Sequence, residues 1–177
     1  MALSLNAADS CKYLSAVINY PVDNSTNVTL QITDAIGTNI AGGINTTFSL
    51  LPGAGAISYP IPVVNLSVNY GVVIVTLVTT ANNTVLGEPK AVLLHCDIDC
   101  CLTKLTNELI DCACDCAKCA SSLAKAQKIF LLLQSANYAL VQANDSEASA
   151  RPGFIQDANS KYLKAKEICD DSCGCDC

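Results

Sequence analysis

The sequence has little of what catalysis and nucleic-acid binding require. Its 177 residues include no tryptophan and one histidine, and only 15% are charged. The ten Lys and Arg residues form no cluster, and the net charge is −6. Nucleic acids and anionic membranes are bound through basic patches, so neither is an expected partner. Nucleophile elbows, phosphate loops and dinucleotide fingerprints are also missing, so we predict a protein without catalytic residues that is not an enzyme.

Long hydrophobic runs are missing too, although 51% of the residues are hydrophobic. The longest apolar runs, residues 71–78 and 128–133, are far shorter than the roughly 20 residues that span a bilayer. The opening MALSLNAADSCKY has no basic flank and no continuous apolar stretch, so no secretory signal is expected. The mean hydropathy of +0.36 is high for a soluble chain, which indicates apolar surface kept for a partner.

Cysteine is almost absent from the first half, where Cys11 is the only one of twelve. The remainder fall into three late clusters: Cys96, Cys100 and Cys101; Cys112, Cys114, Cys116 and Cys119; and Cys169, Cys173, Cys175 and Cys177. This uneven use of cysteine divides the chain into a first domain, residues 1–95, and a Cys-rich domain, residues 96–177.

Residues 1–95 have the pattern of short strands separated by turns. Alternating or continuous apolar runs predict strands at 12–20, 28–33, 46–51, 70–80 and 85–94, the last interrupted at residues 87–89. The run at 70–80 has little polar alternation and should be covered on both faces. Three prolines between residues 51 and 62 predict a loop or a sheet edge. The sequence therefore predicts an antiparallel β-sandwich.

Residues 96–177 change to helical spacing. Apolar residues recur every third or fourth position from a cap at Asp97 or Asp99 to Cys112. A second helix is predicted over 118–143 and a third over 155–169, with a break at 144–153. The complete chain is thus α+β, with the sandwich followed by a Cys-stapled helical hairpin or three-helix segment.

Antiparallel helices would bring the eight cysteines of the last two clusters to one pole. Three chemical states are open for this pole: disulfides, a structural zinc site, or free thiols. No cofactor is expected apart from this possible structural zinc. Cys116 and Cys119 also form a C-x-x-C motif, but the βαβ context of redox enzymes is absent.

Three further features have structural explanations. Cys11 and Cys96 are either core residues or a disulfide that joins the first and last strands. His95 with Cys96, Asp97, Asp99 and Cys100 looks like a ligand cluster, but its place at a strand-to-helix junction favours helix capping. The six N-x-S/T sequons are better explained by the Asn and Thr content of β-turns than by glycosylation: Asn24, Asn27, Asn45, Asn65, Asn82 and Asn144.

The predicted second helix is apolar over more than one face. Its Phe130, Leu131, Leu132 and Leu133 exceed what one helical face can bury. We therefore predict that these four side chains form the interface of a homo-oligomer.

The order of motifs resembles a group of small virion structural proteins of tailed bacteriophages. The resemblance is carried by HCDIDCCLTKL, the turn DCACDCAKC, the helix KAQKIFLLLQSANYAL and the ending CDDSCGCDC, and it covers about the last 80 residues. It implies a non-enzymatic capsid decoration, head fibre, neck or tail component with other virion proteins as partners. Such a protein is made in the bacterial cytosol and oxidises once lysis releases the particle.

Two alternatives remain open at this point. The first is a secreted or surface-exposed, Cys-stabilised adhesin or binding module, which would be extracellular. The second is a small protein with a structural zinc site.

Overall fold

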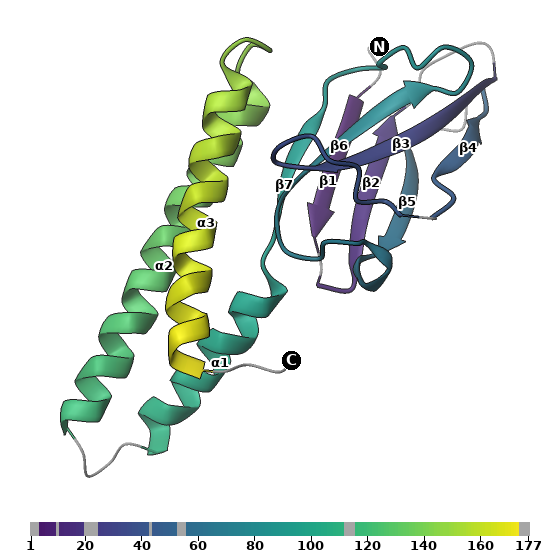
Figure 1. Cartoon of the computed structure of the whole chain (residues 1–177). Helices are drawn as coiled ribbons and strands as arrows, with labels where there is room; N and C mark the ends of the chain where they lie inside the picture. The colour runs from purple at the N-terminus through teal and green to yellow at the C-terminus, as the bar shows by residue number, and fades with distance from the viewer. Residues whose placement is uncertain are drawn as a thin grey trace. The chain divides into compact units, whose positions relative to one another are not determined.

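The structure is a computed structural model that describes residues 4–9, 11–19, 25–42, 44–52, 56–111 and 116–173. The chain divides into two compact units, Met1–Leu94 and His95–Cys177, which we call the β unit and the helical unit (Figure 1). The first contains strands and the second helices, so the predicted α+β class is confirmed.

The β unit contains two antiparallel sheets. One has the strand order β1-β2-β5, formed by β1 (Ser4–Asp9), β2 (Tyr13–Asn19) and β5 (Ala56–Pro62). The other has the order β4-β3-β6-β7, formed by β4 (Thr47–Leu50), β3 (Thr26–Asp34), β6 (Gly71–Thr79) and β7 (Lys90–Leu94). A short 3₁₀ turn at Val63–Asn65 follows β5.

The two sheets share one hydrophobic core, which makes the unit a sandwich. Alternate residues of β2 and β3 point inward, because side chains of a strand alternate between the faces of its sheet. Fully buried examples are Leu14 and Ile18 of β2 and Ile32 of β3. At one margin Phe48 of β4 stacks on Tyr59 of β5, with 4.7 Å between ring centroids. This aromatic pair links the two sheets.

The prolines of β5 occupy positions that do not need a backbone donor. Val63 N–H donates to the carbonyl of Lys12 at 3.0 Å, and this sets the phase of the β2–β5 ladder. Because bonded and non-bonded pairs alternate along an antiparallel ladder, Pro60 and Pro62 fall where the backbone faces away from β2. Removing outward N–H groups from an edge strand makes it less able to pair with another chain. Of the two interpretations given for residues 51–62, the sheet edge is confirmed for β5.

The strands agree with the sequence expectations except at one place. The first strand, β1, was not predicted, because SLNAAD has no β-branched or aromatic residue. The last predicted strand forms over β7 after the predicted interruption at residues 87–89, where Gly87 has a φ of +73° and Pro89 follows. The continuous apolar run of β6 is buried on both faces, as predicted.

The helical unit contains α1 (Cys96–Asp111), α2 (Cys116–Asp145) and α3 (Arg151–Cys173). The long helices α2 and α3 lie side by side (Figure 1). Most of their buried residues recur with alternating steps of three and four, which is the spacing of a left-handed helix pair. The buried positions are Ser122, Ile129, Leu133, Ala136, Ala139, Leu140 and Ala143 on α2, and Ile155, Ala158, Tyr162, Ala165 and Cys169 on α3.

The segment predicted to interrupt the helices is partly helical. Arg151, Pro152 and Gly153 form the first turn of α3, where proline is tolerated because the first N–H groups of a helix have no intrahelical acceptor. Arg151 donates from Nε to the carbonyl of Ala143 at 3.1 Å and from Nη2 to that of Ser146 at 3.2 Å. The guanidinium therefore holds the end of α2 beside the start of α3.

The edge argument predicts that Pro60→Thr/Pro62→Thr makes the protein self-associate through β5. Threonine restores the two outward N–H donors and has high strand propensity. Light scattering against concentration should show association beyond that of wild type under the same conditions. Pro52→Thr, in an exposed turn outside the strands, is the matched control. Unchanged scattering from the double variant would contradict a protective role for these prolines.

Candidate functional site

The outward surface of α2 is the most unusual surface in the helical unit. Opposite the residues that pack on α3, large apolar side chains lie open to solvent, including Phe130 (55% exposed), Leu131 (63%) and Tyr138 (67%). We call this surface the α2 outer face and define it by Leu123, Gln127, Phe130, Leu131, Gln134, Tyr138 and Val141. All seven side chains are exposed. The five apolar ones leave on the order of 500 Å² of apolar surface on one helix, which is a patch of functional size.

Charge is absent from the α2 outer face. Residues 129–144 contain no charged side chain. Lys125 and Lys128 of α2 lie elsewhere, lining a groove of about 360 Å³ with Ile168 and Asp171 of α3. The face is therefore suited to an uncharged, apolar partner.

The four predicted interface residues do not all lie on this face. Phe130 and Leu131 are exposed, Leu132 is half-buried, and Leu133 is 8% exposed because it packs inside the helical unit. Leu133 thus belongs to the core of the helical unit, and the interface itself stays a prediction. Sequence reasoning missed Leu123, Tyr138 and Val141, although Leu123 and Tyr138 each stand seven residues, two helical turns, from Phe130 and Leu131 respectively.

The cysteine predictions have mixed outcomes. Cys11, Cys96, Cys100 and Cys119 are disulfide-bonded. For Cys11 and Cys96 the core interpretation is therefore wrong, and Cys11 lies exposed in a turn with a φ of 62°. Cys101 and Cys169 are buried in the helical unit.

The remaining cysteines of the predicted pole give no further test of it. Cys112, Cys114, Cys175 and Cys177 lie outside the described residues. Cys116 begins α2 and Cys173 ends α3. Among the side chains that the structure describes, no group of three or more His, Cys, Asp or Glu residues is arranged to hold a metal. A single cluster of eight cysteines and a structural zinc site both stay predictions.

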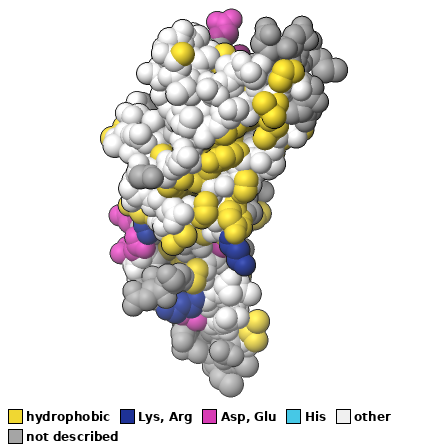
Figure 2. All heavy atoms as spheres, turned by 90° about the vertical axis from the view of Figure 1, so that its right-hand side faces the viewer, with side chains coloured by type: hydrophobic (Ala, Val, Ile, Leu, Met, Phe, Trp, Pro, Cys, Tyr) yellow, Lys and Arg dark blue, Asp and Glu magenta, His cyan; other side chains and the backbone are white. Residues whose placement is uncertain are grey.

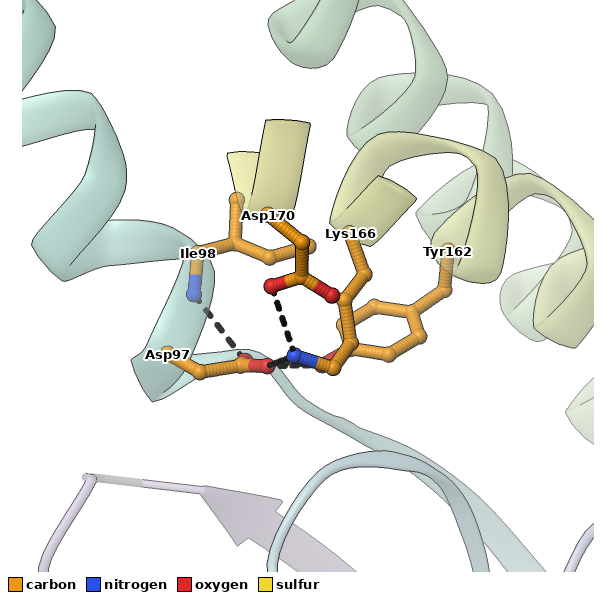
Figure 3. Close-up of polar contacts among 5 residues, drawn as sticks. All are labelled: Asp97, Ile98, Tyr162, Lys166 and Asp170. Atoms are coloured by element: carbon orange, nitrogen blue, oxygen red, sulfur yellow. Dashed lines mark hydrogen bonds and ion pairs between the residues drawn. The ribbon is translucent and has the colours of Figure 1, made fainter. Parts of the chain in front are cut away.

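A polar network joins α1 to α3, and Figure 3 shows it. The hydroxyl of the fully buried Tyr162 lies 2.7 and 2.9 Å from the two carboxylate oxygens of Asp97. Asp97 also accepts the N–H of Ile98 at 2.9 Å and pairs with Lys166 at 3.2 Å. Lys166 extends the network to Asp170, again at 3.2 Å. Asp97 thus binds α3 from within the first turn of α1.

This geometry decides between the interpretations of the His95 cluster. The helix α1 begins at the carbonyl of His95, which accepts N–H groups from Ile98 and Asp99 at 3.0 and 3.1 Å. The imidazole of His95 lies 3.6 Å from the Asp99 carboxylate. With Asp97 engaged by α3, the motif joins helices and supports the start of α1, so the structural interpretation is favoured. The cap, His95, lies two residues before Asp97 and four before Asp99, the caps that the sequence suggested.

The environment of Lys166 favours its charged form. Burial alone would lower the pKa of this amine, but hydrogen bonds and charge attraction from Asp170 and Asp97 together raise the pKa above the ordinary 10.5. The amine of Lys166 therefore holds its proton more strongly in the folded state than in the unfolded chain.

The β unit presents a different kind of surface, neutral and rich in hydrogen-bonding groups. Between residues 24 and 87 the only charged residue is Asp34, whose carboxylate accepts the N–H groups of Ile36 and Thr38 within its own turn. Figure 2 shows one side of this unit, with a band of hydrophobic side chains and few charged ones. Hydroxyl and amide groups instead line the outer side of β3 and β4.

The comparisons with known proteins identify no family. No family model and no curated protein sequence matches this chain. Two solved structures of Bacteroides uniformis beta-glucuronidase 2 are similar to part of it, one a calcium-binding mutant and the other covalently bound to cyclophellitol-6-carboxylate aziridine. Both have 17% sequence identity and a TM-score of 0.28, and the match covers 52% of this chain but 13% of the enzyme. A likeness this weak carries no argument about function. Over the described residues, no helix has the length and apolar character needed to span a bilayer.

The network around Asp97 predicts that Tyr162→Phe destabilises the helical unit by about 1.5–3 kcal/mol, the usual contribution of a hydrogen bond to a charged group. The variant keeps the ring in the core but leaves Asp97 without its buried donor. Urea unfolding followed by helical circular dichroism measures the change. Tyr138→Phe removes a hydroxyl from an exposed ring and should leave the midpoint unchanged. Equal midpoints for wild type and Tyr162→Phe would contradict the role of this hydrogen bond.

The raised pKa of Lys166 predicts a defined pH dependence. A group whose pKa is higher in the folded state stabilises the fold below its unfolded pKa, and this contribution is lost as pH rises through the folded pKa. The difference in unfolding free energy between wild type and Lys166→Met should therefore be constant from pH 7 to about pH 10 and shrink above that. Lys161→Met removes a lysine from the same helix and serves as the control. A difference that stayed constant to pH 12 would contradict the assignment.

Proposed function

We propose that this protein is a non-enzymatic structural component that self-associates through the α2 outer face. The observation that carries the proposal is the exposed apolar stripe along α2 with no charge within it. A large apolar patch in contact with water is unfavourable, and covering it with another apolar surface recovers that free energy.

A second copy of the chain fits this face better than a partner of another kind. Nucleic acids and acidic proteins are recognised through positive charge, which the face does not have. Two copies of the same uncharged apolar face are mutually complementary, and soluble oligomers are mostly built from such like-with-like contacts.

The setting we propose is the particle of a tailed bacteriophage, on the strength of the sequence resemblance in the helical half. A particle component is used in many copies, so a built-in self-association surface suits it. In this proposal the disulfides among the cysteines form after the particle leaves the reducing cytosol.

Leu131→Glu is expected to dissociate the assembly, because a carboxylate would have to be desolvated in an apolar contact. Sedimentation velocity of the full chain should shift from an oligomer toward a monomer, with the dissociation constant rising at least about 100-fold. Leu163→Glu is the matched control, since Leu163 is a leucine of α3 that is 48% exposed and lies off the α2 outer face. An oligomer unaffected by Leu131→Glu, or dissociated equally by both variants, would contradict an interface on α2.

A surface-exposed binding module is the second candidate, and the outer side of β3 and β4 favours it. There Asn27 accepts the Ser49 hydroxyl at 2.6 Å, and the hydroxyls of Thr29 and Thr47 are 3.0 Å apart. These contacts orient neutral donors and acceptors on a sheet, an arrangement that suits a neutral, hydroxyl-rich ligand. Retardation of the protein in gels containing neutral polysaccharides, lost in Asn27→Ala/Thr47→Ala, would support this candidate over the first.

A further inference from the structure

We infer that the α2 outer faces of two copies pair antiparallel, about a two-fold axis that passes beside Phe130 and Leu131. This inference rests on the proposed self-association and adds the orientation and register of the contact. It follows from how apolar, amide and charged side chains are distributed along the face.

The apolar side chains match when the axis lies there. Phe130 and Leu131 of one copy lie beside Leu131 and Phe130 of the other at the centre, and Leu123 faces Tyr138 of the second copy. All four of these side chains are about half exposed or more in a single chain. A contact with its largest apolar groups at the centre excludes water best from the positions that contribute most.

The two glutamines are paired by the same register. Gln127 and Gln134, both exposed, lie at nearly equal distances on either side of the axis, so Gln127 of each copy faces Gln134 of the other. A primary amide has both donor and acceptor atoms, so two facing amides satisfy each other. Sliding one helix by a turn places a glutamine against Phe130, which leaves a polar group unpaired in an apolar contact. The amides therefore select the register.

The ends of the helix favour the antiparallel orientation over the parallel one. Asp145 is exposed at the last residue of α2, and no acidic residue lies in the first turn of that helix. Antiparallel pairing places Asp145 beside the start of the second copy's α2, where unpaired N–H groups carry partial positive charge. Parallel pairing would place Asp145 against Asp145 of the second copy and align the two helix dipoles.

The test uses charges introduced at the two glutamines of the full-length protein. In antiparallel pairs, Gln127→Glu/Gln134→Lys sets Glu against Lys at both sites, whereas Gln127→Glu/Gln134→Glu sets Glu against Glu. The residues four positions before and after each site are uncharged, so the introduced charges have no competing partner on their own helix face. Glutamine, glutamate and lysine also have similar helix propensities, and circular dichroism checks that the fold is kept.

Sedimentation velocity should give the Glu/Lys variant a dissociation constant equal to or below that of wild type at low salt. The Glu/Glu variant should dissociate at least about tenfold more readily, because facing like charges repel. Equal weakening of both variants overturns the inference, since in a parallel pair each introduced charge faces its own kind. A wild-type dimer that neither variant changes also overturns it, because the contact then lies elsewhere. A wild-type chain that stays monomeric at all concentrations instead overturns the proposed self-association itself.

Discussion

The close packing of α2 on α3 is the interaction on which the helical unit depends. Small buried residues such as Ala136, Ala143, Ala158 and Ala165 recur along the contact and let the two backbones approach. Apart from its contact with α1, where Ser122 bonds to Glu108, α2 buries one stripe against α3 and leaves its opposite stripe uncovered. On α2 that opposite stripe is apolar, so the packing that makes the unit stable also creates the surface we assign to assembly. Tyr162 contributes to this packing and also to the attachment of α1, because its ring fills the core between the helices while its hydroxyl bonds to Asp97 of α1.

The β unit remains compact with very few charges by managing its hydrogen-bonding groups. Its turns use side-chain acceptors such as Asp34 and Asn45 for backbone N–H groups, and its edge strand β5 replaces two outward donors with proline. A surface with few charges has little electrostatic repulsion to keep copies apart. Protection of the sheet edge against pairing is therefore more important in this unit. In the proposed function, self-association uses the α2 outer face, whose apolar groups are arranged in a regular stripe.

Much of the fold could be predicted from the sequence because the spacing of apolar residues along the chain indicates strands and helices. The central strands β2, β3 and β6 and all three helices follow from spacings of two or of three to four residues. The failures have physical causes. The strand β1 forms from residues of low strand propensity because it pairs with β2. The start of α3 includes a proline and a glycine because the first turn of a helix tolerates both, and Arg151 anchors it to α2. For the candidate site, two of four predicted side chains, Phe130 and Leu131, lie fully on the exposed face.

The sequence by itself determined where strands give way to helices, that the second half holds eleven cysteines, and that α2 is apolar on more than one side. It did not determine which side of α2 is buried, because Leu131 and Leu133 are equivalent in hydropathy and differ only in their direction around the helix. The docking of α3 decided that Leu133 packs inside and Leu131 faces solvent. Tertiary contacts also decided that Asp97 serves α3 as a buried acceptor, since the partners Tyr162 and Lys166 are distant in sequence and meet it only when the helices fold together.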